Sequence, residues 1–266
     1  QTAGRTTLMG EGLQHQDGHS LLMASTVPSC RAYDPSFAFE LGIIIEDGLH
    51  RMYEQNEDVF YYLTIYNENY LQPALETSYS KEDLIKGLYK FKSASGHHKH
   101  QATILFSGTA YGAAAKAAEL LADQYDVGVD LWSATSYKAL REDALSTERN
   151  NFLNSDDTAG ISFVASQLGQ SEGPIVAITD FITLVPDQIA RWVPRDYTCL
   201  GTDGFGRSDT REKLRQHFEV TAEHLAMTVL SRLAVAGELD QSERDRAIQQ
   251  FKLPTNLPDP WSAIFY

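Results

Sequence analysis

The stretch that decides the fold is ATILFSGTAYGAAAKAAELLADQYDVGVDLW, residues 102–132. It begins with a run of apolar and β-branched residues, Ala102–Phe106, that is typical of a buried strand. An alanine-rich segment, 109–125, follows with apolar side chains at helical spacing. A second apolar run, Val127–Trp132, ends the stretch. Strand, helix and strand in this order predict two parallel strands joined by a crossover helix.

The same alternation continues on both sides of this stretch. Upstream, the sequence predicts a strand at Val27–Tyr33, a helix from Asp34 to Met52, and a strand at Val59–Tyr66 that is buried on both faces. Downstream, it predicts a helix at Thr135–Leu145 and a buried strand at Gly173–Ile178. The predicted fold class is therefore α/β, with mostly parallel sheets and flanking helices.

Residues 71–100 change in character and are expected to connect two domains. Pro73 and the polar segment Glu76–Ser78 come first, followed by a short helix that Ser80 caps. A strand is expected at Leu88–Lys92, and Gly96–His100 is expected to be an exposed basic turn. Its three histidines have no nearby carboxylate or cysteine that would complete a metal site.

A glycine-rich segment, GTDGFGRSD at residues 201–209, lies near the end of the chain. It matches neither the dinucleotide-binding pattern nor the phosphate-binding loop of nucleotide hydrolases, so a structural role is the better interpretation. The residues Asp209–Glu212 fit a helix start, with the helix ending near Phe218. A second helix is expected from Val220, and an extended tail from Leu253.

The composition limits the class of protein and of partner. The chain has 266 residues, 42% of them hydrophobic and 22% charged, as in a folded globular protein. A formal net charge of −14 argues against nucleic acid and against an anionic membrane as partners. Two cysteines far apart in sequence indicate no disulfide framework and favour a cytoplasmic setting. Because the chain opens at Gln1 without methionine, we expect it to be a piece of a longer polypeptide.

The segment GEGLQHQDGHS, residues 10–20, concentrates proton-transfer groups among glycines. Its glycines argue against a helix and favour an irregular loop from which His15, Asp17 and His19 project into one space. Three interpretations stay open on the residues alone. The loop could be catalytic, it could bind zinc or non-haem iron through its histidines and aspartate, or it could be an inert solvated turn.

A second group of candidates follows the predicted strand at Val59–Tyr66. Asn67, Glu68 and Asn69 come directly after it. Loops at the carboxyl ends of strands in open α/β sheets are common ligand sites, so these three residues are substrate-pocket candidates. An ordinary turn would explain the same residue types.

Three segments carry a family resemblance: GRTTLMGEGLQHQDGHS at residues 4–20, the segment 33–70 that begins YDPSFAFELG and ends in NENY, and GTDGFGRSDTREKLRQHFEV at residues 201–220. Together they resemble the thiamine-diphosphate-dependent dehydrogenase component of bacterial pyruvate dehydrogenase complexes, of the homodimeric type. The resemblance runs in register to at least Leu239. It implies that residues 1–76 end a pyrimidine-binding domain and that residues 77–266 form a transketolase C-terminal-type domain.

The resemblance also implies a reaction and its partners. Members of the family decarboxylate pyruvate and transfer the acetyl group to a lipoyl group of the partner dihydrolipoamide acetyltransferase. The cofactors implied are thiamine diphosphate and Mg²⁺, held mainly by parts of the enzyme that are not in this chain, and the cofactor-binding residues of this chain stay unknown. The remainder of the same enzyme and a second subunit of a homodimer are the other implied partners.

The resemblance assigns roles to residues 10–20, which we call the histidine loop. His15 occupies the position of the family histidine that reaches the active centre, where it would bind a carboxylate or a developing alkoxide. His19 would be a second catalytic group, and Asp17 would fix the loop or orient an imidazole. No metal ligand is assigned, and the chain alone is expected to be inactive. The alternatives are a non-catalytic dimerisation module and a related thiamine enzyme for another 2-oxo acid or a sugar phosphate.

Overall fold

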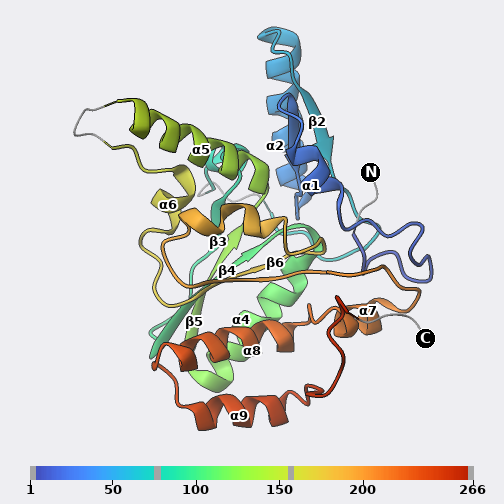
Figure 1. The fold of residues 1–266 in the computed structure, drawn as a ribbon, viewed down its shortest axis with the longest axis vertical. Helices are drawn as coiled ribbons and strands as arrows, with labels where there is room; N and C mark the ends of the chain where they lie inside the picture. Colours follow the sequence, from blue (N-terminus) through green and yellow to red (C-terminus); the bar gives the residue numbers. More distant parts are fainter. Residues whose placement is uncertain (1–3, 75–78, 155–158, 263–266) are drawn as a thin grey trace.

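A five-stranded sheet forms the centre of the larger part of the molecule. The computed structural model describes residues 4–74, 79–154 and 159–262 (Figure 1). The strand order is β3 (Tyr89–Lys92), β5 (Val127–Ser133), β4 (His100–Phe106), β6 (Ile175–Ile178) and β7 (Tyr197–Leu200). β3 pairs antiparallel with β5, and the other pairs are parallel, as the sequence predicted for most of the sheet.

The predicted strand–helix–strand unit at the centre of the chain is confirmed. β4 leads through a 3₁₀ turn, Gly108–Ala110, into α4 (Tyr111–Tyr125), and the chain returns as β5 beside β4. The two strands are in parallel register along their whole length. After β5, the chain crosses over β4 and forms β6 on the other side of it. The connection from β4 to β5 and the connection from β5 to β6 therefore lead toward opposite edges of the sheet.

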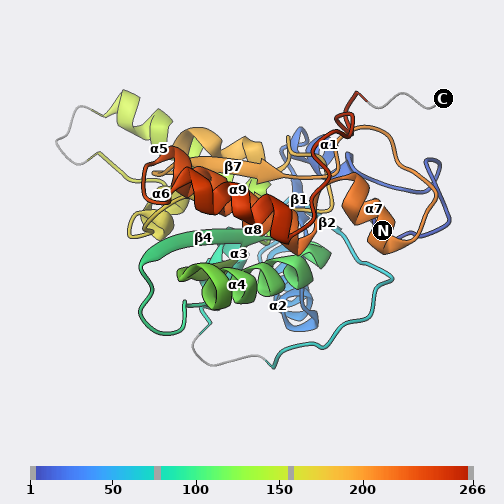
Figure 2. The same cartoon turned by 90° about the horizontal axis from the view of Figure 1, so that it is seen from below.

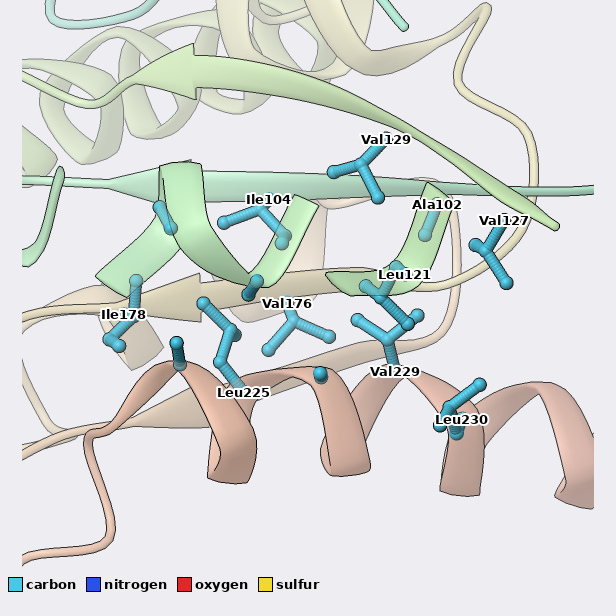
Figure 3. Packing of buried hydrophobic residues seen from close by; sticks show 14 of the residues in the cluster. Ala102, Ile104, Leu121, Val127, Val129, Val176, Ile178, Leu225, Val229 and Leu230 are labelled. Carbon is cyan, nitrogen blue, oxygen red and sulfur yellow. The ribbon is translucent and has the colours of Figure 1, made fainter. Parts of the chain in front are cut away.

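Helices cover both faces of the sheet, so this part has three layers (Figure 2). On one face, α4 and α8 (Ala222–Val235) pack against alternate strand residues, and Figure 3 shows Ile104, Val176 and Ile178 directed toward these helices. α9 (Gln241–Gln250) packs outside α8. Because successive strand residues point to opposite faces, Leu105 and Ala177 belong to the other core.

The opposite face is covered by α5 (Tyr137–Leu153), α6 (Phe163–Leu168) and the 3₁₀ helix Pro186–Trp192. α5 is longer than the predicted helix. Its last turns were not predicted because they are mostly polar, and the two apolar residues at the end, Phe152 and Leu153, are exposed. β7 and α9 were not predicted. Both have a weak apolar pattern: β7 is half-buried at the sheet edge, and α9 buries only Ala247.

The N-terminal part contains the other predicted strand–helix–strand unit. α1 (Ser20–Ser25) precedes β1 (Cys30–Tyr33), α2 (Ala38–Leu49) continues into a π-helical turn (His50–Glu54), and β2 (Phe60–Leu63) pairs in parallel with β1. The expectation that this last strand is buried on both faces is wrong. In the part of the chain that the structure describes, β2 pairs with β1 alone, and Phe60 is half exposed.

The connection between the two parts is mostly as expected. α3 (Lys81–Lys86) begins at Ser80, whose hydroxyl accepts a hydrogen bond from the Asp83 N–H group at 3.1 Å. The expected exposed turn is corrected at its end, because His100 is buried as the first residue of β4. The polar segment Glu76–Ser78 and the domain boundary expected between residues 76 and 77 lie outside the described residues, so that boundary stays a prediction.

The remaining helix near the candidate site is α7 (Arg211–His217). Thr210 caps it by accepting a hydrogen bond from the Lys213 N–H group at 3.4 Å.

Among the described residues, no helix combines the length and the apolar character that a membrane crossing needs. Cys30 and Cys199 are both free thiols, and the cytoplasmic setting expected from them stays a prediction.

Candidate functional site

The histidine loop is irregular, as its glycines predicted, and it is clamped to the segment before α7. Gly10 and Gly12 adopt positive φ angles of 78° and 75°. The Gln16 side chain accepts a hydrogen bond from the Arg207 N–H group at 2.8 Å and donates one to the Arg207 carbonyl at 2.6 Å. The Gly10 N–H group donates to the Asp209 carbonyl at 3.1 Å. These contacts fix the loop from residues almost 200 positions away.

Asp17 binds the start of α1. Its carboxylate accepts hydrogen bonds from the N–H groups of His19 and Ser20, both at 3.0 Å, and from the Ser20 hydroxyl. Its own N–H group donates to the Gly4 carbonyl at 3.2 Å. A carboxylate at a helix N-terminus is favourable because it satisfies free N–H groups and complements the helix dipole. Asp17 therefore fixes where the loop ends and where α1 begins.

His19 lies against the buried guanidinium of Arg5. Arg5 Nη2 is 3.1 Å from His19 Nε2, and Arg5 also donates to the Thr202 carbonyl at 2.5 Å and to the Gly204 carbonyl. Burial, with a contribution from Arg5, lowers the pKa of His19, so the imidazole is neutral near pH 7 and can accept a hydrogen bond. Gly18 is required here, because a Cβ atom would lie 2.3 Å from Arg5 Nε.

The imidazoles of His15 and His19 both belong to exposed residues of the loop. They differ in their neighbours, and His15 lies beside Glu11. The His15 side chain is 59% exposed, and its Nδ1 lies 3.7 Å from a Glu11 carboxylate oxygen. The Asp17 carboxylate contacts the main-chain N–H group of His19, the His19 ring contacts Arg5, and the His15 ring lies beside Glu11. A loop that is hydrogen-bonded to the segment before α7 and carries an exposed imidazole can present that group to a ligand or to another polypeptide.

The candidates after β2 are held by α7. Glu68 forms a two-pronged ion pair with Arg215: Nη1 lies 3.1 Å from Oε1, and Nη2 contacts Oε2. Arg211 Nη2 donates to the Asn67 carbonyl at 3.2 Å, and Asn67 and Asn69 are exposed. Of the three substrate-pocket candidates, Glu68 is the one whose side chain the structure fixes by an ion pair.

Sequence reasoning missed the residues that join the segment before the histidine loop to the segment after β2. Arg215 Nε donates to the Thr6 hydroxyl at 3.3 Å, and this hydroxyl donates to Asp180 Oδ1 at 2.7 Å. The Asp180 carboxyl group is buried, and desolvation raises its pKa to about 6. Thr6 and Arg215 lie within two of the segments that carried the resemblance. No sequence signal showed that they meet, because 209 positions separate them.

A cavity of about 90 Å³ lies beside this group. It is located beyond the carboxyl ends of β4 and β6, where the crossover connections of the sheet change direction. In open α/β sheets this is the usual place for a ligand. The residues that line it include Thr6, Glu68, Tyr70, Thr109, Thr179, Asp180 and Arg215.

The described residues offer no set of metal ligands. No group of three or more histidine, cysteine, aspartate or glutamate side chains gathers around a common point in residues 4–74, 79–154 and 159–262. The zinc or iron interpretation of the histidine loop therefore has no ligand set in this part of the chain.

Comparison with known proteins gives two family matches. Residues 1–73 match the model of the pyruvate dehydrogenase E1 component middle domain, and residues 87–221 match the model of the transketolase-like TK C-terminal domain. These matches and the resemblance in the sequence agree.

Curated relatives are similar along nearly the whole chain. A pyruvate dehydrogenase E1 component from Mycolicibacterium smegmatis is 49% identical over 253 residues, which cover 95% of this chain and 27% of the relative. The protein of the same name from Mycobacterium tuberculosis is 45% identical over 97% of this chain and 29% of its own length. The chain thus spans between a quarter and a third of the length of these relatives.

Solved structures are similar in fold. Transketolase from Leishmania mexicana has a TM-score of 0.61 at 16% identity, over 87% of this chain and 29% of its own. Transketolase from Pichia stipitis, in complex with sedoheptulose 7-phosphate, has a TM-score of 0.61 at 17% identity, over 99% of this chain and 32% of its own. At this level of identity the likeness concerns the fold alone, and it agrees with the predicted α/β class.

Proposed function

The chain belongs to the transketolase-like C-terminal domain family, joined to a middle domain of the pyruvate dehydrogenase E1 type, and from this premise we propose that it forms part of an enzyme that decarboxylates pyruvate. In such an enzyme the acetyl group passes to a lipoyl group of an acyltransferase. The observation that carries the proposal is the 45 to 49% identity to E1 components over at least 95% of this chain.

The cofactor of this reaction would be thiamine diphosphate with Mg²⁺. The cofactor supplies the carbanion chemistry when it is bound, while protein groups orient the substrate and move protons. Among the described residues, no group of three or more histidine, cysteine, aspartate or glutamate side chains could hold the metal ion. What does fit is a role at the reacting end, where an exposed imidazole on a fixed loop can reach a substrate.

We assign the three residues of the histidine loop different tasks. His15 would donate a hydrogen bond to the substrate carboxylate or to an oxygen on which negative charge develops. His19, neutral and bound to Arg5, would be the second catalytic group of the loop. Asp17 would keep His15 in place through its bonds to the start of α1. Asn67, Glu68 and Asn69 would form a second wall of the substrate pocket.

The partners follow from the same proposal. The remainder of the enzyme would hold the cofactor, the exposed side of the histidine loop would face the substrate and the incoming lipoyl group, and two copies would form a homodimer. The chain alone would then be inactive. The proposal is tested against two alternatives. The chain could be a non-catalytic assembly module, or it could belong to a thiamine enzyme for another 2-oxo acid or a sugar phosphate.

The test is a chimera of the Mycolicibacterium smegmatis relative in which this chain replaces the matching 253 residues. We expect turnover of pyruvate with thiamine diphosphate and Mg²⁺, measured as acceptor reduction, to lie within about tenfold of the unaltered relative. A folded chimera that prefers a longer 2-oxo acid or a sugar phosphate would assign the chain to a related enzyme. A folded chimera without turnover of any of these substrates would favour the assembly module.

A further inference from the structure

We propose that Arg215 is a positioning residue that sets both candidate site segments from α7. One guanidinium binds Glu68 in the segment after β2 and Thr6 at the beginning of the segment that continues into the histidine loop. The proposal rests on the proposed function, because it assigns Arg215 an effect on turnover through Glu68. It gives the C-terminal domain a direct part in shaping the site.

The Arg215–Glu68 pair has the geometry of a specific contact. Both nitrogens at the end of the guanidinium face both oxygens of the carboxylate, and the side chains are only 27% and 19% exposed. A two-pronged pair fixes the plane and the direction of a carboxylate, which a single contact does not. At this depth it is also less screened by solvent than a surface pair.

The third donor of the same guanidinium extends the contact to a second segment. Arg215 Nε donates to the Thr6 hydroxyl, which is anchored on the buried Asp180 at the end of β6. The Thr6 N–H group also donates to both carboxylate oxygens of Asp180 at 3.2 Å. The position of Thr6 is therefore tied to the sheet and to α7 together.

Arg211, one turn earlier on α7, strengthens the arrangement through the backbone. Its Nε donates to the Thr7 carbonyl at 3.0 Å and its Nη2 to the Asn67 carbonyl at 3.2 Å. Arg211 thus holds the main chain of the same two segments, whereas Arg215 holds side chains. The carboxylate that Arg215 orients is the one that lines the cavity beyond β4 and β6. This location distinguishes the pair from an ordinary interdomain contact.

Lysine cannot replace Arg215 in this role. An ammonium group is compact and lacks the planar fork that engages a carboxylate and a hydroxyl at the same time. The variant Arg215→Lys would keep the charge beside Glu68 and Asp180 but lose the fixed direction of the Glu68 carboxylate. This variant therefore tests the geometry of the side chain at position 215 while its positive charge is kept.

The experiment uses the full-length chimera with Arg215→Ala, Arg215→Lys, Glu68→Gln and the double variant Arg215→Ala/Glu68→Gln. The matched control is Arg232→Ala, which removes another two-pronged pair, to Asp196, away from both segments. We expect kcat/KM for pyruvate to fall by about tenfold to a hundredfold in both Arg215 variants, as for a misplaced site group. The control is expected to change it less than about twofold.

The double variant identifies the path of the effect. If Arg215 acts through Glu68, the double variant loses no more activity than the more damaged single variant, because the two changes break the same contact. Losses that multiply in the double variant would overturn the proposal, and so would a folded Arg215→Ala chimera with unaltered kcat/KM.

A second readout separates this proposal from the proposed function. Amide hydrogen exchange of residues 4–20 and 64–70 reports whether the two segments are held in place, whatever the enzyme does. We expect faster exchange in both segments with Arg215→Ala and no change there with Arg232→Ala. Should the unsubstituted chimera fold without turnover, the proposed function fails, and unchanged exchange in Arg215→Ala would then refute the positioning role independently.

Discussion

Asp180 offers a prediction whose magnitude follows from the structure. The carboxyl group is 3% exposed, and its hydrogen bonds from Thr6 offset only part of the cost of burying its charge. Its pKa is raised from the ordinary value of 3.8 to about 6. The folded chain therefore retains a proton between these two pH values that the unfolded chain has released.

The sign of the effect on stability follows directly. Because the folded state binds the extra proton, the free energy of unfolding contributed by Asp180 decreases as pH rises from about 4 to about 6 and is constant above that range. The difference between the two pKa values corresponds to about 3 kcal/mol. Roughly half of this decrease is expected between pH 5 and pH 7.5, since the unfolded group is mostly ionised at pH 5 already.

The perturbation is Asp180→Asn, which keeps the size of the side chain and abolishes its titration. Urea unfolding of the purified chain and of the variant would be followed from pH 5 to pH 7.5. We expect the stability of the variant relative to the original chain to increase by roughly 1 to 2 kcal/mol across this range. Any constant offset from altered hydrogen bonds to Thr6 cancels in this comparison. Two stability curves that stay parallel from pH 5 to pH 7.5 would refute the reasoning.

Two further predictions concern stability. Glu40→Ala should lower the free energy of unfolding by about 3 to 5 kcal/mol. The buried carboxylate accepts hydrogen bonds from Tyr89 and Ser133 and from two N–H groups before α2, and the variant loses all of them. Thermal unfolding with an unchanged midpoint would contradict this prediction. Gly173→Ala should cost about 2 to 4 kcal/mol, since its φ is +66° and a Cβ atom would lie 1.9 Å from the Gln101 carbonyl oxygen. Its matched control, Gly42→Ala in α2, meets open space and should stabilise the chain by about 0.5 to 1 kcal/mol in urea unfolding.

The sequence predicted the elements that carry strong apolar patterns. β4 and β6 were found because they are nearly uninterrupted apolar runs, and α4 because its buried residues recur at the spacing of a helix. β7 and α9 were missed because the first is a four-residue strand at the sheet edge and the second is almost entirely polar. The apolar pattern of β2 was misleading in the opposite way. Its aromatic residues suggested burial, although Phe60 at its start is half exposed.

The candidate site was predictable in part. Glycine spacing predicted that residues 10–20 form a loop, and the resemblance marked the segments that pack around it. Sequence could not reveal that Asp17 would be engaged by α1 and His19 by Arg5, because these contacts depend on where the chain turns. Contacts such as Arg215 to Glu68 join residues 147 positions apart, and local patterns contain no information on them.

The proposed role of His15 at the reacting substrate is tested by comparing His15→Ala with His50→Ala in the chimera. His50 is the matched control, because its imidazole is similarly exposed and also lies beside a glutamate four residues away. If His15 interacts with the reacting substrate, pyruvate turnover should fall by about a hundredfold or more in His15→Ala with unfolding unchanged, and by less than about twofold in His50→Ala. Equal turnover in the two folded variants would contradict a catalytic role for His15 and would leave the histidine loop as a structural element.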